Sequence, residues 1–157
     1  MTKYLFLILF TLTLAACSSV PRFTSVKRVN ENARIKEKNN ISSNENDLAL
    51  YENVKPLKTY SGIASYYSDE FNGRRTSNGE LYDMNDMTAA EPELPFNSIV
   101  RVINTENSKS ILLRINDRGP IKKGRIIDVS YAAAKKLGMI SKGTANVIIE
   151  VLRQGEK

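Results

Sequence analysis

Apolar and polar positions divide the 157-residue chain into three parts. Residues 4–14 are almost all apolar, residues 18–59 show no sustained periodicity, and residues 60–157 contain short runs of Ile, Val and Leu separated by turn residues. Short β-branched runs bounded by turn residues are typical of strands. The pattern therefore predicts a β-domain at 60–157, preceded by two segments of a different kind.

The β-domain is expected to contain several strands and one helix. The expected strands are residues 60–67, 99–104, 110–116, 125–129 and 145–152. Residues 131–137 form the expected helix, because they are rich in Ala and Lys, Ser130 is suited to cap the first turn, and Gly138 is suited to end the last. Many short strands with one short helix predict a small, mainly β barrel.

The N-terminal segment has the features of an export signal. Lys3 precedes the apolar run, whose eleven residues would rise only about 16 Å as a helix. A hydrocarbon core of ~30 Å is too thick for that helix, so residues 1–16 are expected to be a cleaved lipoprotein signal peptide. Residues 14–17, Leu-Ala-Ala-Cys, resemble a bacterial lipobox, which makes Cys17 the expected lipidation site. The alternative is a chance cysteine after an ordinary signal.

Residues 17–59 are expected to be the lipidated Cys17 followed by a flexible tether. Between 18 and 59 there are seven Asn and five Ser, together with charges of both signs. This composition favours disorder, since it offers little apolar surface to bury. Such a tether would let a membrane-anchored domain reach targets nearby.

Composition excludes several classes of function. The chain has no histidine and one cysteine, which excludes Ser-His-Asp and Cys-His catalysis, an intrachain disulfide and a multi-cysteine zinc site. The usual His-ligated metal sites are excluded as well. The net charge of +6 is unevenly distributed, because residues 60–157 hold 14 basic and 12 acidic side chains, whereas residues 18–59 hold eight and five. A folded domain so close to neutral argues against nucleic acid as a partner.

Two segments, 73–80 and 116–120, place Gly or Pro next to ionisable side chains. Asp117 lies where an expected strand passes into a turn, so a rigid strand end would hold an accessible carboxylate there. The alternative is a local turn in which Asp117 accepts hydrogen bonds from nearby backbone N–H groups. Glu80 is expected to be exposed. Asp128 lies between two apolar residues and is interpreted as a buried acid that needs an Arg or backbone partner.

Residues 62–152 resemble the rare lipoprotein A (RlpA) family. The matching segments are residues 62–67, 71–80, 87–90, 94–96, 116–120 (Asn-Asp-Arg-Gly-Pro) and 125–134, in the expected order. The resemblance implies a six-stranded double-psi β-barrel with one or two short helices. The lipobox and the polar tether are also typical of that family.

The resemblance implies a function as well. Members of the family are lytic transglycosylases that act on peptidoglycan and prefer glycan strands without stem peptides. They cleave the β-1,4 bond between MurNAc and GlcNAc without water. A carboxylic acid protonates the glycosidic oxygen, the sugar's own C6 hydroxyl attacks, and a 1,6-anhydro sugar results. This chemistry needs no metal or organic cofactor.

Roles in that reaction transfer to the matching residues. Asp117 is the implied general acid and base. Glu80 is the implied second carboxylate, which stabilises positive charge or orients the sugar. Tyr66, Tyr67 and Arg118 are further candidates for the glycan groove, with packing as the alternative role of the two tyrosines.

Glu91 departs from the family pattern. The family usually has His after Thr-Ala-Ala, and this chain has Glu91 there. Glu91 is therefore a third candidate catalytic residue, with two outcomes open. If its carboxylate lies beside Asp117 or Glu80, like-charge repulsion should raise the pKa of one carboxyl and keep a proton available. Otherwise the site has lost an essential group, and the alternative function is that of a non-catalytic, expansin-like peptidoglycan-binding or scaffolding protein.

The cellular context is also an expectation. Ser18 follows the lipobox cysteine, and a residue other than Asp there implies sorting to the outer membrane of a Gram-negative bacterium, facing the periplasm. The expected partners are peptidoglycan glycan strands, the membrane through Cys17, and cell-wall or division proteins. Many family members carry a C-terminal SPOR domain. This chain ends at Lys157 after its last expected strand, so septal recruitment by that route is not expected.

Overall fold

The computed structural model describes residues 45–119 and 122–156. The predicted signal peptide, the lipidation of Cys17 and the predicted tether up to residue 44 lie outside the described residues. None of the helices within these ranges has the length and apolar character needed to cross a membrane.

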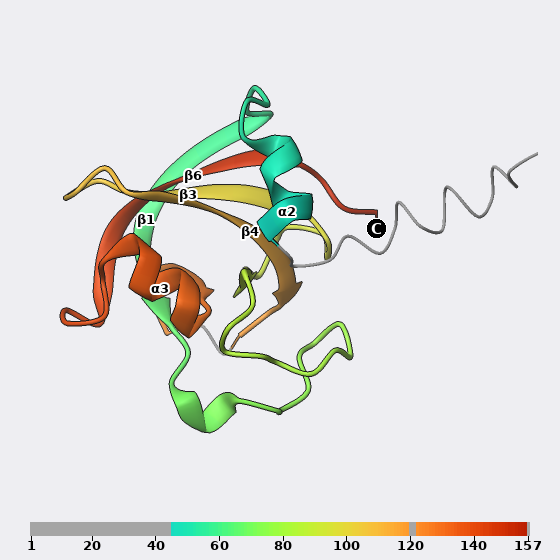
Figure 1. Cartoon of the computed structure of the whole chain (residues 1–157), viewed down its shortest axis with the longest axis vertical. Coiled ribbons are helices and arrows are strands. Elements are labelled where there is room, and N and C mark those ends of the chain that lie inside the picture. Colours follow the sequence, from blue (N-terminus) through green and yellow to red (C-terminus); the bar gives the residue numbers. More distant parts are fainter. Residues whose placement is uncertain (1–44, 120–121, 157) are drawn as a thin grey trace, which may run out of the picture.

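Six strands form a closed barrel in the order β1-β5-β2-β4-β3-β6. Their bounds are β1 Lys58–Tyr66, β2 Thr88–Ala90, β3 Ile99–Asn104, β4 Ser110–Asp117, β5 Arg125–Val129 and β6 Thr144–Arg153. The pairs β1/β5 and β2/β4 are parallel, whereas β1/β6, β2/β5, β3/β4 and β3/β6 are antiparallel. The predicted six-stranded double-psi β-barrel is therefore confirmed (Figure 1).

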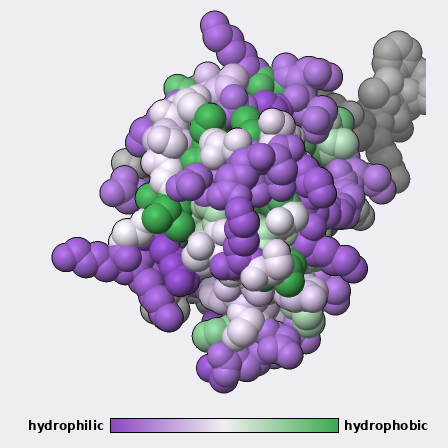
Figure 2. Space-filling model, turned by 90° about the vertical axis from the view of Figure 1, so that its left-hand side faces the viewer, coloured by the Kyte–Doolittle hydropathy of each residue, from purple (hydrophilic) through white to green (hydrophobic). Residues whose placement is uncertain are grey.

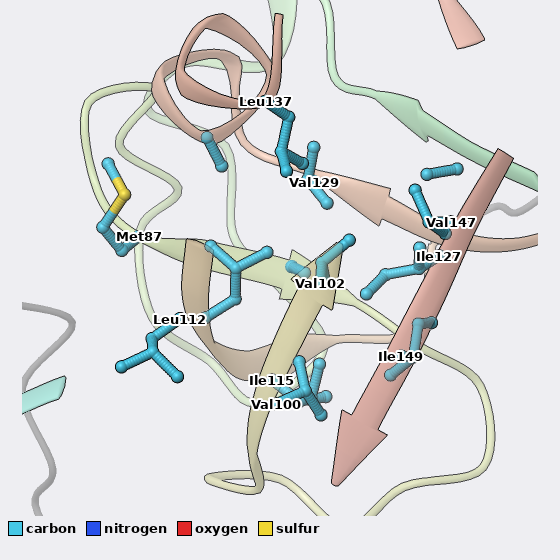
Figure 3. Close-up of a cluster of buried hydrophobic side chains, with 14 of the residues drawn as sticks. Met87, Val100, Val102, Leu112, Ile115, Ile127, Val129, Leu137, Val147 and Ile149 are labelled. Atoms are coloured by element: carbon cyan, nitrogen blue, oxygen red, sulfur yellow. The ribbon is translucent and has the colours of Figure 1, made fainter. Parts of the chain in front are cut away.

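The barrel interior is filled by β-branched and Leu side chains, which in β3 and most of β6 alternate with more exposed residues. Figure 3 shows the main core cluster, and the labelled strand residues inside the barrel are Val100, Val102, Ile115, Ile127, Val129, Val147 and Ile149. Leu112 also belongs to the cluster, but it pairs with Arg101 and lies on the outer side of β4. All except Leu112 are at most 1% exposed. Burial of an apolar side chain of this size stabilises the fold by about 1.5–3 kcal/mol. The alternation also fixes which strand residues face outward, and the candidate site is built from those.

The helices are short. They are α2 at Glu45–Leu48, α3 at Tyr131–Leu137, and the 3₁₀ turns η1 at Ala49–Tyr51 and η2 at Asp69–Phe71. The prediction for 131–137 is confirmed, because Ser130 accepts a hydrogen bond from the N–H of Ala133, and Gly138 ends the helix with a φ of 69°. A positive φ of this kind favours glycine.

The residues just before β1 belong to the folded unit. Leu48 is 2% exposed and lies in the main core cluster. Tyr51 and Val54 are partly buried and pack against this cluster. Arg101 of β3 donates hydrogen bonds to the carbonyls of Tyr51 and Glu52. The expectation of a flexible tether up to residue 59 is therefore wrong for its described part, because Leu48 and the Arg101 hydrogen bonds join this segment, with α2 beside β4, to the barrel (Figure 1).

One face of the molecule is seen in Figure 2. Hydrophilic residues cover most of it, and hydrophobic residues appear in small, separated groups. Scattered apolar side chains are normal on a protein surface and identify no binding area by themselves. On this face, no large hydrophobic area indicates a functional site, and the candidate residues are polar.

Candidate active site

The segment between β1 and β2 folds back on the end of β4. Arg75 and Leu81 pair in an isolated β-bridge, and Gly79 turns the chain between them with a φ of 91°. The N–H of Asn78 donates to the carbonyl of Asn116 at 3.3 Å, which joins this turn to β4. In Figure 1 the segment runs below the barrel. The two Gly-containing segments identified in the sequence therefore meet.

Asp117, the last residue of β4, receives four hydrogen bonds. Ser77 donates to Oδ1 through its N–H at 2.9 Å and its hydroxyl at 2.5 Å. The N–H of Arg118 donates to the same oxygen at 2.7 Å, and the Tyr67 hydroxyl donates to Oδ2 at 2.6 Å. Partial burial acts to raise the pKa of Asp117, but these donors together hold the pKa below its ordinary value. Asp117 is therefore an ionised carboxylate near neutral pH.

Glu80 is held against the outer face of β4. Arg114 donates to its two carboxylate oxygens at 2.9 and 2.7 Å, and Asn116 donates at 3.1 Å. The Arg114 side chain is 6% exposed, whereas that of Glu80 is 42% exposed. Burial acts to raise the pKa of Glu80, but the hydrogen bonds from Arg114 and Asn116 outweigh it and lower the pKa. Glu80 is thus a fixed, accessible negative charge.

Glu91 contacts the site through its backbone. Its N–H donates to the carbonyl of Asp117 at 3.1 Å, and its carbonyl accepts from the guanidinium of Arg118 at 2.9 Å. The carboxylate instead accepts from the Tyr60 hydroxyl at 3.3 Å and from two N–H groups of the following loop. The repulsion expected for a Glu91 carboxylate beside Asp117 or Glu80 is not found, because the pKa values of both are lowered.

Tyr66 and Tyr67 point to opposite sides, as successive residues of an extended chain do. Tyr67 is 9% exposed and its hydroxyl reaches Asp117. The Tyr66 hydroxyl donates to the carbonyl of Ile140 at 3.3 Å, and its ring packs edge-on against Tyr131. The packing alternative is therefore favoured for Tyr66, because its side chain lies against α3 and the main core, and its contact with glycan stays a prediction.

Arg118 is half-buried next to Asp117 but directs its charge elsewhere. Its guanidinium lies 3.7 Å from the centre of the Phe96 ring and also donates to the Asp117 carbonyl at 3.3 Å. A cation over an aromatic face is held electrostatically by the ring. The Arg118 side chain is therefore held next to the carboxylate by Phe96 and by the Glu91 carbonyl, and its contact with a sugar stays a prediction.

Sequence reasoning missed Arg114 and Ser77. Arg114 occupies the middle of an apolar strand, and a buried charge there requires a partner, so its position was the available signal. Ser77 gave no comparable signal, because its role arises from the way the turn folds on β4. Within residues 45–119 and 122–156, no group of three or more His, Cys, Asp or Glu side chains lies where it could hold a metal ion.

Residues 59–149 match the family model described as "Lytic transglycolase". The chain belongs to this family. Over 94 residues it is 60% identical to the endolytic peptidoglycan transglycosylase RlpA of Vibrio cholerae, and over 98 residues it is 56% identical to the protein of that name from Neisseria meningitidis serogroup A. These matches cover 60% and 62% of this chain. They cover only 36% and 41% of the two relatives, so the chain spans less than half of their length.

Solved structures of lower identity share the barrel. Streptomyces papain inhibitor superposes with a TM-score of 0.51 at 21% identity, over 64% of this chain and 100% of the inhibitor. A variant expansin of Clavibacter michiganensis, solved with cellohexaose, superposes with a TM-score of 0.50 at 15% identity, over 64% of this chain and 53% of the expansin. At such identities the likeness concerns the fold alone.

Proposed function

We propose that this member of the lytic transglycolase family is a lytic transglycosylase of peptidoglycan. It cleaves the MurNAc-GlcNAc β-1,4 bond, leaves 1,6-anhydroMurNAc ends, and prefers glycan strands without stem peptides. The observation that carries the proposal is the meeting of Asp117 and Glu80 at one end of the barrel, where both are ionised, accessible and fixed by several donors. The relatives named as endolytic peptidoglycan transglycosylases support it.

Each carboxylate has a role that its surroundings favour. Asp117 accepts the proton of the C6 hydroxyl as this oxygen attacks the anomeric carbon, because its lowered pKa keeps it ionised until then. Glu80 lies against Arg114 with its remaining surface open, and it stabilises positive charge that develops on the sugar. Glu91 is a positioning residue, since its backbone bridges Asp117 and Arg118.

The proposal includes a place in the cell. Lipidation of Cys17 would anchor the barrel to the outer membrane facing the periplasm, within reach of the glycan. The charge balance of residues 60–157, 14 basic against 12 acidic, suits a weakly charged polymer better than a nucleic acid. Cell-wall or division proteins are further proposed partners.

The test is digestion of peptide-stripped glycan and of intact sacculi by the full chain and by Asp117→Asn. We expect anhydro-ended fragments from wild type, more from stripped glycan, and few from the variant. Asp69→Asn is the matched control, because Asp69 is an exposed aspartate that receives none of the bonds described here. Retained glycan binding without fragments from wild type would instead support the expansin-like scaffold, for which the replacement of the family's His by Glu91 is the motivating observation.

A further inference from the structure

A row of outward-facing residues crosses four neighbouring strands. Ser65 of β1 pairs with Asp128 of β5, Asp128 pairs with Ala90 of β2, and Ala90 pairs with Asp117 of β4. Directly paired residues project on the same face of a sheet. Ile127 and Val129, on either side of Asp128, belong to the core, so Asp128 points out of the barrel. The register of β2 on β4 shifts between Ala89 and Ala90, and this shift places Asp117, rather than Asn116, opposite Ala90. The two aspartates are two strand spacings apart, roughly 10 Å between backbones.

The two aspartates differ in their donors. Asp117 receives four hydrogen bonds, whereas within residues 45–119 and 122–156 Asp128 receives one, from the hydroxyl of Ser65 to Oδ1. Ser65 in turn accepts from the guanidinium of Arg125 at 2.7 Å. Asp128 is 7% exposed, and no hydrogen bond to its Oδ2 comes from residues 45–119 or 122–156. One carboxyl oxygen is therefore held by Ser65, and a small part of the residue stays exposed to solvent.

Charges around Asp128 leave it the less acidic of the pair. Burial raises the pKa of Asp128, and the negative charge of Asp117 adds a smaller increase. Ser65, Arg125 and Lys122 lower it, but the net pKa stays above the ordinary value of an aspartate. Tyr67, the other titratable group facing both carboxyls, has a raised pKa and stays neutral. Carboxyl groups whose surroundings separate their pKa values in this way are suited to act as acid and base.

We propose that Asp128 is the proton donor to the glycosidic oxygen, acting with ionised Asp117 across the row. This rests on the transglycosylase function proposed above. The Asp128 proton moves to the oxygen of the leaving GlcNAc as the C1–O4 bond breaks. The C6 oxygen forms the new C1–O6 bond, and its proton moves to Asp117. Proton exchange with solvent then returns Asp128 to the acid and Asp117 to the carboxylate, so no water is consumed.

The experiment follows the initial rate of anhydro-end formation from peptide-stripped glycan against pH. Asp128→Asn should lower the rate roughly 100-fold or more while glycan binding is retained. In wild type, the rate should fall on the alkaline side as Asp128 loses its proton. Ser65→Ala removes the donor to the carboxylate, so this alkaline limb should move to higher pH. Lys122→Gln should move it in the same direction, whereas Lys123→Gln, in the same loop, should leave it unchanged.

A purely structural role would lower the amount of folded protein and leave the alkaline limb in place. The proposal is overturned if Asp128→Asn stays within about threefold of wild type, or if the limb moves in neither Ser65→Ala nor Lys122→Gln. Both outcomes leave the transglycosylase function standing. A wild-type protein that forms no anhydro ends overturns that function itself, and the assignment of Asp128 with it. If Asp128→Asn does not fold, the pH profiles of Ser65→Ala and Lys122→Gln still test whether Asp128 is the proton donor.

Discussion

Glu91 shows how one side chain supports a site without facing it. Its carboxylate accepts from the Tyr60 hydroxyl and from the N–H groups of Glu93 and Leu94, while its backbone is bonded to Asp117. Glu91 is 5% exposed, so removal of the acceptor would leave the buried N–H of Leu94 and two partly buried donors unpaired. The Glu that replaces the family's His is therefore accommodated because its carboxylate accepts hydrogen bonds from the loop that follows it.

Two variants of Glu91 distinguish a structural hydrogen-bond acceptor from a carboxylate that takes part in the reaction. Glu91→Gln keeps an oxygen that accepts from the loop, so we expect anhydro-end formation within about threefold of wild type. Glu91→Ala should lose about 1–3 kcal/mol of unfolding free energy in urea titration, because the loop donors become unpaired. A large loss of activity in a fully folded Glu91→Gln would show that the ionised carboxylate takes part in the reaction.

Asp117 should link stability to pH. Its pKa is lowered in the fold, so its contribution is present above the unfolded-state pKa, about 4, and is lost as the pH falls through the folded value. We expect Asp117→Asn to be less stable than wild type by about 1–2 kcal/mol at neutral pH, since its donors lose a charged acceptor. The difference should vanish at the acidic end of a urea-unfolding series. An equal difference at every pH would contradict this account.

At the scale of elements, α2 and η1 join the chain before β1 to the barrel. Leu48 is 2% exposed in the main core, whereas Leu50, two residues later, is 79% exposed. Two leucines in one short segment thus offer a matched comparison of burial. Leu48 therefore attaches the segment before β1 to the core of the barrel.

Truncation of each leucine should measure that attachment. Leu48→Ala should lower the unfolding free energy by about 2–4 kcal/mol, because it removes buried methyl groups and leaves a cavity. Leu50→Ala should change it by less than about 0.5 kcal/mol. Chemical denaturation of both variants checks this. Equal, small effects would mean that residues 45–57 contribute little to the stability of the barrel.

The elements also show what could be predicted from sequence. The strands at 99–104 and 125–129 and the helix at 131–137 have the predicted bounds, because β-branched runs and helix caps are local signals. Strand β2 at Thr88–Ala90 was missed, since three residues are too few to show a period. Docking of Leu48 was missed because an isolated leucine in a polar stretch carries no pattern.

The candidate site was predicted only in part. Motif resemblance identified Asp117 and Glu80, and the structure brings the two together through Ser77 and Asn116. The outward row that contains Asp128 depends on strand register across the barrel, which no local pattern specifies. Contacts between segments that are distant in the sequence therefore could not be predicted from local patterns.

The whole molecule is proposed to combine a lipid anchor at Cys17, a polar chain segment and a glycan-cleaving barrel. Cys17→Ala should abolish membrane association or stall processing, because it removes the proposed attachment site. Membrane fractionation of cells expressing each form measures this, with Ser18→Ala as the control for a neighbouring change. Unchanged membrane association of a Cys17→Ala protein whose signal peptide has been removed would exclude the lipid anchor.

Above all, we propose that the barrel cleaves glycan without adding water. The most direct measurement is the mass of the fragments released from peptide-stripped glycan strands by the full chain. We expect fragments that end in 1,6-anhydroMurNAc and carry no added water, and their near absence with Asp117→Asn. Reducing-ended fragments that have gained one water would identify a hydrolase and contradict the account. No fragments at all, from folded protein that binds the glycan, would contradict it as well.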